Sequence, residues 1–200
     1  MTYIISADEL KKTLPGYDPS RSDEFHRESA RLADKAYESA LKTRAEAGVI
    51  LLSGGAASGK TEYLSAYIKQ KDAIILDGTL PSFEGAKIKI RNAMKYGRAV
   101  SIVAVMPESF IIAFSAFLGR QRKFPPEHFF RTHSDSRRTL LKVAEAFPDV
   151  VITVIDSRYN TDNSMSFTEI TFDKRQALLE LLRSRQYTEE AIRNEIFHAA

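Results

Sequence analysis

Short runs of aliphatic residues recur along the chain, and longer stretches with apolar residues at helical spacing separate them. Each run is nearly continuous in Val, Ile, Leu and Ala, which is typical of strands covered on both faces, as in a parallel sheet. A later run, Phe167–Phe172, alternates between apolar and polar positions and predicts an edge strand. The continuous runs predict strands at Tyr3–Ser6, Val49–Ser53, Ala73–Asp77, Ala99–Met106 and Val150–Asp156.

Helical patterns fill the intervals between these strands. Ser22 is suited to cap a long helix, with Asp23 and Glu24 in its first turn, and we expect Gly48 to end it. The alternation of strand and helix predicts a three-layer α/β fold in one domain, residues 1–200, with a mostly parallel five-stranded sheet and helices on both faces. Further helices are predicted at Lys60–Gln70, Ser82–Tyr96, Pro107–Leu118, Ser134–Phe147 and Lys174–Arg185, then a short one capped by Thr188, while Thr13–Ser20 predicts a loop.

Composition excludes several classes of protein. The chain has no cysteine, which excludes disulfides, thiolate catalysis and cysteine-based zinc sites. It shows neither an apolar run that could span a bilayer nor the pattern of a signal peptide, so we expect a cytoplasmic protein without membrane contact. The net charge of +3 is small for a nucleic-acid-binding protein.

The excess positive charge is concentrated in one segment, between Gly119 and Arg138. This segment favours two interpretations, a solvated helix face or a clamp for phosphate groups. Its basic residues are Arg120, Arg122, Lys123, Arg131, Arg137 and Arg138, against the acidic Glu127 and Asp135.

A glycine-rich motif lies between the second predicted strand and the helix after it. The spacing of Gly54, Gly59, Lys60 and Thr61 is that of a P-loop, and the strand–loop–helix context supports it. In such a loop the backbone N–H groups surround phosphate, the lysine reaches the β and γ phosphates, and the threonine hydroxyl binds Mg²⁺. The alternative is a glycine-rich turn with an incidental lysine. We therefore predict a site for ATP or GTP with Mg²⁺ at Gly54, Gly55, Ala56, Ala57, Ser58, Gly59, Lys60 and Thr61.

Three aspartates follow or end predicted strands: Asp8, Asp77 and Asp156. Carboxylates at the C-terminal ends of parallel strands point into the crevice where open α/β sheets bind ligands. There a carboxylate can orient Mg²⁺ or accept a proton from a nucleophile. Each could instead be a helix N-cap or a turn residue.

Several segments together resemble the zeta-toxin-like P-loop kinases. Besides the P-loop, the segment Ala7–Tyr17 is similar to that family's strand, Asp, short helix, Leu-Pro and aromatic residue. Leu76–Thr79 resembles its acid-Gly-Thr after a buried strand, and His26–Ser29 its His-Glu-Ser helix. The segment Gly119–Pro125 is similar to its arginine-containing segment over the phosphates. The order of segments along the chain differs from that of the family in one respect: here the Asp8 segment precedes the P-loop, whereas in the family it follows the P-loop.

The resemblance implies a P-loop kinase that transfers the γ-phosphate of ATP or GTP to a hydroxyl of a small molecule such as a UDP-N-acetyl sugar, and an antitoxin protein as partner. Asp8 would be the base, and Arg122 or Arg120 would stabilise the transferring phosphoryl group. Arg158 would contact the purine ring of the nucleotide. The acceptor would be bound by Asp8, Lys11, His26, Glu28, Ser29, Asp77 and Thr79.

Two other functions compete with the small-molecule kinase. One is a toxin-like or regulatory module that binds nucleotide without turnover; it differs from a kinase in needing no carboxylate at the acceptor site. The other is a polynucleotide kinase. The small net charge and the lack of aromatic residues among the basic ones argue against nucleic acid, because single-strand binding usually needs stacking surfaces.

Overall fold

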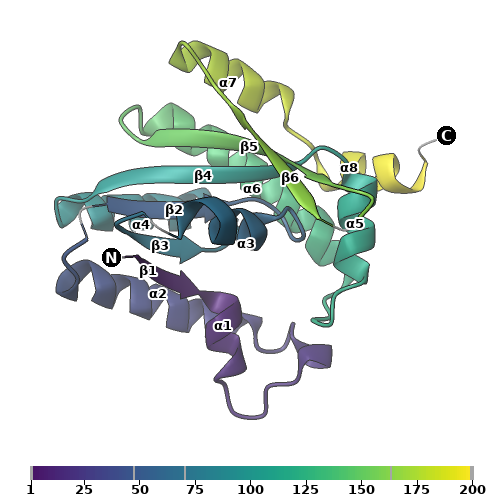
Figure 1. Ribbon diagram of the computed structural model, residues 1–200, viewed down its shortest axis with the longest axis horizontal. Helices are drawn as coiled ribbons and strands as arrows, with labels where there is room; N and C mark the ends of the chain where they lie inside the picture. Colours follow the sequence, from purple (N-terminus) through teal and green to yellow (C-terminus); the bar gives the residue numbers. More distant parts are fainter. Residues whose placement is uncertain (1, 47, 70, 163, 199–200) are drawn as a thin grey trace.

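The computed structural model describes residues 2–46, 48–69, 71–162 and 164–198, and one six-stranded sheet runs through them (Figure 1). The strand order is β1-β3-β2-β4-β5-β6, in which the first five strands are parallel and β6 is antiparallel to β5. This confirms the mostly parallel α/β fold, and the predicted edge strand is β6, which adds a sixth strand. The strands are β1 (Tyr3–Ser6), β2 (Gly48–Ser53), β3 (Ala73–Asp77), β4 (Ala99–Pro107), β5 (Val151–Tyr159) and β6 (Met165–Ile170).

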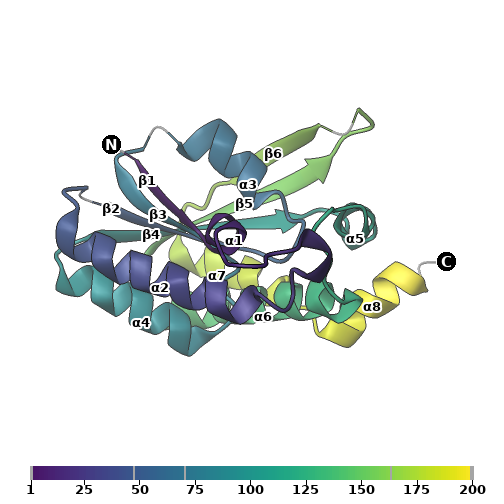
Figure 2. The ribbon, with the colours of Figure 1, turned by 90° about the horizontal axis from the view of Figure 1, so that it is seen from below.

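Helices cover both faces of the sheet, as predicted, but unequally. Figure 2 shows α2, α4, α6 and α7 in one layer, with α3 on the other side of the sheet. Within the described ranges, no helix combines the length and apolar character that a membrane span requires. The helices are α1 (Ala7–Lys12), α2 (His26–Thr43), α3 (Lys60–Tyr63), α4 (Phe83–Lys95), α5 (Phe110–Leu118), α6 (Pro126–Ala146), α7 (Arg175–Ser184) and α8 (Glu189–Phe197), with a 3-10 turn at Pro19–Arg21 and a π-helical turn at Leu64–Ile68 that continues α3.

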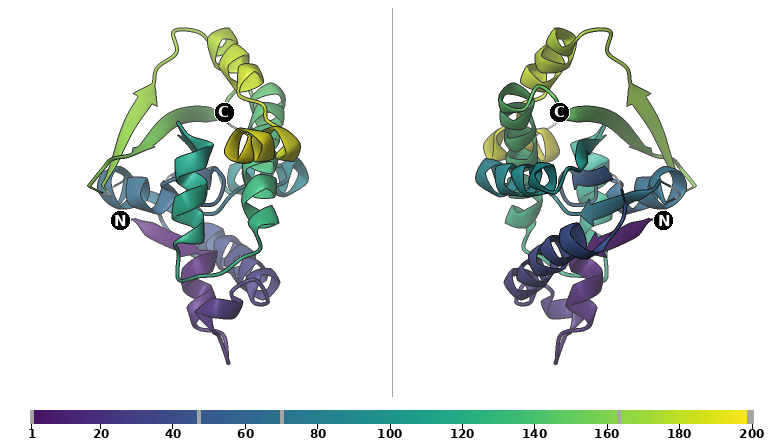
Figure 3. Two further views of the ribbon diagram at one scale, coloured as in Figure 1. Left: turned by 90° about the vertical axis from the view of Figure 1, so that its right-hand side faces the viewer. Right: turned by 90° about the vertical axis from the view of Figure 1, so that its left-hand side faces the viewer.

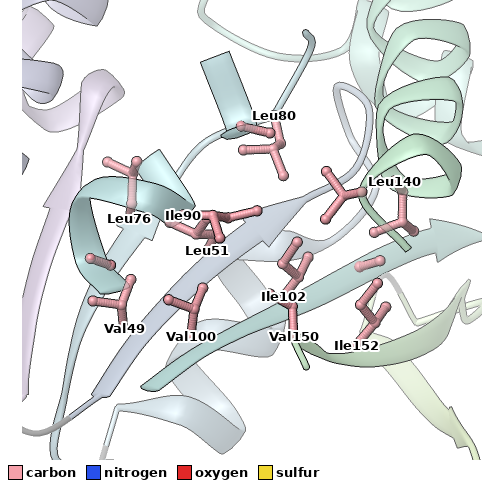
Figure 4. Close-up of a cluster of buried hydrophobic side chains, with 14 of the residues drawn as sticks. Val49, Leu51, Leu76, Leu80, Ile90, Val100, Ile102, Leu140, Val150 and Ile152 are labelled. Atoms are coloured by element: carbon pink, nitrogen blue, oxygen red, sulfur yellow. The ribbon is translucent and has the colours of Figure 1, made fainter. Parts of the chain in front are cut away.

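The aliphatic runs fill both layers because successive side chains of a strand point to opposite faces. In β2, Val49 and Leu51 pack in the large layer under α2, α4 and α6, whereas Ile50 and Leu52 pack under α3 and the π turn. Figure 4 shows Val49 and Leu51 in the large layer, together with side chains of α4 and α6. The continuous aliphatic pattern therefore predicted doubly covered strands correctly.

Several predicted helix boundaries are wrong. Helix α2 begins at His26 after Phe25, because Ser22 is buried and its hydroxyl accepts a hydrogen bond from Lys11 instead of capping. It ends at Thr43, and Gly48 opens β2. Pro107 ends β4, so α5 begins later, at Phe110.

Two further boundaries differ at α6 and β5, while the predicted cap of the last helix, Thr188, is confirmed. Helix α6 begins at Pro126, earlier than predicted, and β5 continues past Asp156 to Tyr159. Ser82 and Thr188 cap α4 and α8 through their hydroxyl groups. Gln70, predicted to end the helix after the P-loop, lies outside the described residues.

In the sheet, the N-terminal strand β1 lies two positions from β2, the strand that leads into the P-loop, and β3 lies between them. Strand β1 pairs in parallel with β3, with Ser6 opposite Asp77, and β3 pairs with β2. The C-terminal ends of β1, β3 and β2 therefore lie on one edge of the sheet. Figure 3 shows the two ends of this order, with β1 and α1 at the bottom and β6 and α7 at the top.

Candidate functional site

A cavity of about 380 Å³ lies at the C-terminal edge of β1, β2 and β3. Its volume falls within the range of roughly 300–1,000 Å³ that small-molecule sites occupy. The P-loop forms one wall, and the start of α1, the segment after β3 and the segment after α5 form others. The predicted site residues that line it are Asp8, His26, Ala56, Ala57, Ser58, Gly59, Lys60, Thr61, Asp77, Thr79, Arg120 and Arg122.

The P-loop depends on backbone conformations that favour glycine. Gly54 and Gly59 have φ of 139° and 85°, and a Cβ on Gly54 would lie 2.3 Å from the carbonyl oxygen of Val105. Ala57 is also left-handed, with φ of 59°. Such a conformation costs a non-glycine residue on the order of 1 kcal/mol and persists where neighbours hold it.

Side chains from α6 and β5 hold three consecutive P-loop carbonyl groups. His133 Nε2 lies 2.8 Å from the oxygen of Ala56, the Tyr159 hydroxyl donates to Ala57 at 2.8 Å, and the Ser157 hydroxyl donates to Ser58 at 2.7 Å. These three side chains do not line the cavity, and the N–H groups of the loop other than that of Ala56, which Thr132 accepts, remain to form an anion-binding nest. The loop is thus organised by its surroundings as well as by its glycines.

Lys60 is hydrogen-bonded to the loop that carries it. Its Nζ donates to the carbonyl oxygens of Gly54 at 2.9 Å and Gly55 at 2.7 Å. Gly54 and Gly55 therefore contribute carbonyl groups to the site without lining the cavity. Burial lowers the pKa of Lys60 to about 8, opposed by the attraction of Asp77. At that pKa most Lys60 side chains are still cationic at pH 7, as phosphate binding requires.

The two cavity carboxylates lie in different electrostatic environments. Asp8 forms an ion pair with Arg122, and its Oδ1 lies 3.8 Å from Lys11 Nζ. Burial alone would raise the pKa of Asp8, but the attraction of Arg122 and Lys11 together lowers it below its ordinary value. Burial raises the pKa of Asp77, opposed by the attraction of Lys60, and Ser6 donates to its carboxylate at 3.3 Å. Asp8 is therefore ionised at neutral pH.

The residues present fit a nucleoside triphosphate with Mg²⁺. The N–H groups of a loop with left-handed glycines and the cation of Lys60 would form a cradle for phosphate. The Thr61 hydroxyl, at the start of α3 and on the cavity wall, would bind Mg²⁺. Among the carboxylates around Lys60, Asp77 attracts the ammonium group most strongly.

Four predicted acceptor or nucleotide contacts do not line this cavity. Glu28 forms an exposed ion pair with Arg31. Ser29 is buried and donates to the carbonyl of His26. Lys11 is fully buried against Ser22, and Arg158 is exposed with its Nε 3.9 Å from Glu108. Only His26, of the three α2 residues proposed, reaches the cavity wall.

Neither interpretation of the basic segment describes all of it. Arg120 and Arg122 line the cavity, as a phosphate clamp requires. Arg138 is exposed and pairs with Asp135, as in a solvated helix face. Arg137 is almost fully buried, an environment that neither interpretation predicts.

Sequence reasoning missed the side chains that support the P-loop and one wall of the cavity. Thr132, whose hydroxyl accepts from the N–H of Ala56 at 3.0 Å, lies 76 positions along the chain from it. Ser157, Tyr159 and His133 are equally remote from the loop, so no local pattern points to them. Phe124 and His128 stack with centroids 4.3 Å apart and line the cavity beside His26.

The sequence matches no family model and no curated protein. Its fold is similar to solved structures of the complex between AvrRxo1-ORF1 and AvrRxo1-ORF2. The complex with sulphate ions matches with 13% identity and a TM-score of 0.50, over 87% of this chain and 76% of the other. The native complex matches with 14% identity and a TM-score of 0.51, over 89% and 77%. At such identity the likeness shows the fold alone, an α/β fold with a mostly parallel sheet.

Proposed function

We propose that this chain is a P-loop kinase that transfers the γ-phosphate of ATP or GTP to a hydroxyl group of a small molecule. The observation that carries the proposal is that Asp8, Lys60 and Arg122 share one cavity beside the glycine-rich loop. A carboxylate for the acceptor and cations for the phosphates are the groups that phosphoryl transfer uses. The resemblance of the Asp8, Asp77 and Gly119–Pro125 segments to zeta-toxin-like kinases supports the same reaction.

In the proposed reaction the acceptor hydroxyl oxygen bonds to the γ-phosphorus, and its proton passes to the Asp8 carboxylate. The bond from the γ-phosphorus to the β–γ bridging oxygen breaks, and the nucleoside diphosphate leaves with that electron pair. Lys60 and Arg122 stabilise the charge that shifts toward the leaving oxygen. Mg²⁺ held at Thr61 would neutralise phosphate charge.

Arg122 has two alternative partners in this proposal. In the structure it pairs with Asp8, which lowers the basicity of the carboxylate. Triphosphate in the cradle would compete for the guanidinium, because phosphate accepts bidentate hydrogen bonds from arginine. Asp8 would then be free to accept the proton, so nucleotide would bind before the acceptor's proton is removed.

The acceptor we propose is a nucleotide sugar, such as a UDP-N-acetyl sugar, bound against His26, Asp77 and Thr79, all of which line the cavity. We also propose a protein partner of the antitoxin kind. The support for it is that the neighbouring solved structures are themselves complexes of two different gene products.

A second candidate is a module that binds nucleotide without turnover. The observation in its favour is that the charged groups are already occupied: Asp8 by Arg122, and Lys60 by the carbonyl groups of Gly54 and Gly55. Such a module would bind ATP as tightly as a kinase but would leave every acceptor unmodified.

A transfer assay separates the two functions. Wild-type protein is incubated with γ-labelled ATP or GTP, Mg²⁺ and a panel of nucleotide sugars, nucleosides, dinucleotides and single-stranded oligonucleotides. A kinase labels one class of small molecule, and Lys60→Ala abolishes both labelling and nucleotide binding. Binding without any labelled product would support the module, and labelling of oligonucleotides alone would support a polynucleotide kinase. Unchanged ATP affinity in Lys60→Ala would contradict both P-loop functions.

A further inference from the structure

A buried guanidinium group that does not line the cavity contacts the P-loop through His133. Arg137 is 4% exposed and belongs to α6, one helical turn after His133. Among the described residues, no carboxylate oxygen lies within 4.0 Å of its guanidinium nitrogens, and its Nε is buried without a hydrogen-bond partner. Asp156 and Glu195 attract it over longer distances, while Arg185 repels it, and Asp156 is itself paired with Arg185.

The surroundings of Arg137 are mostly aromatic. Its guanidinium carbon lies 4.8 Å from the centroid of the Phe110 ring and 5.7 Å from that of Tyr187. Cation–π contacts of this kind offset only part of the cost of burying a charge. A core chosen for stability alone would hold an apolar side chain of similar size at this position. Core stability therefore does not explain why a charged side chain occupies position 137.

A hydrogen-bonded chain connects Arg137 to the P-loop. Because a carbonyl oxygen only accepts, His133 Nε2 carries the hydrogen that Ala56 receives at 2.8 Å. Nδ1 of the neutral ring is then an acceptor, and Arg137 Nη1 lies 3.2 Å from it. Arg137 thus fixes the tautomer of His133 that holds the loop. His133 also lies so close to the loop that a Cβ on Gly55 would be 2.2 Å from its ring.

We infer that Arg137 is a positioning residue for phosphate binding: it fixes His133 against the P-loop and places an unneutralised positive charge behind the anion nest. The charge acts on bound phosphate through protein interior, where water screens it little. The inference rests on the proposed function, because it requires a polyphosphate group in the loop. It concerns affinity for that group and not proton transfer or the choice of acceptor.

The opposite responses of stability and affinity test this role. In Arg137→Met the buried charge is replaced by an apolar side chain, so the melting temperature stays equal or rises. The affinity for inorganic tripolyphosphate, measured by calorimetry, is expected to fall about tenfold, the scale of one charge acting at roughly 10 Å in a protein interior. Arg137→Lys keeps the charge and should retain most of the affinity.

Arg138→Met is the matched control, because it removes the same charge one position away, from an exposed side chain paired with Asp135. Arg138→Met should leave tripolyphosphate affinity unchanged at moderate salt. The ¹⁵N resonance of His133 Nδ1 gives a second readout, which should shift in Arg137→Met but not in Arg138→Met. Equal tripolyphosphate affinity in wild type and Arg137→Met would overturn the inference. Unfolding of Arg137→Met would also overturn it, as would a loss of affinity that Arg137→Lys does not restore. If wild-type protein itself fails to bind tripolyphosphate, the proposed function fails instead.

Discussion

At the scale of single residues, Asp8 is the side chain whose role is most sharply testable. The N-cap position of α1 is Ser6 and Asp8 lies in the first turn, so Asp8 is not the N-cap that its sequence context also allowed. Asp8→Asn keeps the size of the side chain but removes the proton acceptor. We expect nucleotide affinity within a few-fold of wild type and a transfer rate lower by about 10²- to 10⁴-fold, the usual effect of losing a general base.

Glu9→Gln provides the control for Asp8→Asn in the same transfer and binding assays. Glu9 is the next residue of α1, is exposed and pairs with Lys12, so its substitution makes the same change of charge outside the cavity. Transfer in Glu9→Gln should equal that of wild type. A transfer rate in Asp8→Asn within threefold of wild type would move the role of base to Asp77.

Arg122 is expected to act mainly on the transition state. Arg122→Ala removes a cation that meets the phosphoryl group as charge shifts, an interaction on the order of 3 kcal/mol. The value of kcat should therefore fall by about 100-fold, while ATP affinity changes much less, because on nucleotide binding the guanidinium only exchanges the Asp8 carboxylate for phosphate. Lys123→Ala is the control, because the exposed Lys123 ammonium donates to the carbonyl of Leu118. An equal loss of affinity and rate in Arg122→Ala would instead indicate a ground-state clamp, and no loss would transfer the role to Arg120.

At the scale of elements, the end of β5 supports the P-loop. The Tyr159 hydroxyl donates to Ala57, the non-glycine residue of the loop with positive φ. Tyr159→Phe removes this hydrogen bond, typically about 1 kcal/mol, while keeping the ring. We expect ATP affinity to fall about fivefold by calorimetry. Tyr96→Phe, at the exposed end of α4, should not change it. A Tyr159→Phe variant with wild-type affinity would show that the hydrogen bond from Tyr159 is not needed to hold the loop for nucleotide.

The elements most accurately predicted from sequence are those that local pattern determines. The strands were found because their aliphatic runs must be buried on both faces, and the P-loop because its glycines, Lys60 and Thr61 are consecutive or nearly so. The predicted start of α2 is wrong because Lys11, outside the local capping pattern, donates a hydrogen bond to the hydroxyl of Ser22. Pro126 followed by Glu127 was a signal for the start of α6 that was overlooked.

The limits of predicting the site follow from helix geometry. Successive residues along the side of a helix are rotated by about 100° each, so the residues of the His26–Ser29 motif point in different directions. His26 lines the cavity, whereas Glu28, two positions on, lies on the exposed side, and Ser29 faces the core. The supports of the P-loop, such as His133, come from elements that only the folded chain brings together.

At the scale of the whole molecule, the order of the strands in the sheet matters more than their order in the chain. Strand β1 comes first in the sequence but pairs with β3 at the outer edge. Parallel strands share the same C-terminal edge wherever they occur in the chain, so Asp8 reaches the same cavity as Lys60 and Asp77. The placement of the Asp8 segment ahead of the P-loop therefore does not remove it from the site.

Three histidines with lowered pKa make the stability of the whole fold sensitive to acid. Burial lowers the pKa of His128 to about 4, and burial also lowers the pKa of His26 and of His133. In the unfolded chain a histidine takes up its proton near pH 6.5. Between about pH 6.5 and 4 these histidines bind more protons in the unfolded chain than in the folded one, so their contribution to the free energy of unfolding falls as pH falls through this window and does not change above it. By pH 5 the contribution of His128 alone is a loss of about 2 kcal/mol.

His128→Phe tests this acid sensitivity, because phenylalanine can keep the stacking on Phe124 and Phe117 but cannot bind a proton. Urea unfolding at pH 7 and pH 5 should show a smaller difference between the two values of pH for the variant than for wild type. His198→Gln, at an exposed position after α8, should leave the difference as it is in wild type. Because both proteins carry the same carboxylates and the same other histidines, the comparison isolates His128. Parallel losses of stability in wild type and His128→Phe would show that protonation of His128 does not limit the fold in acid.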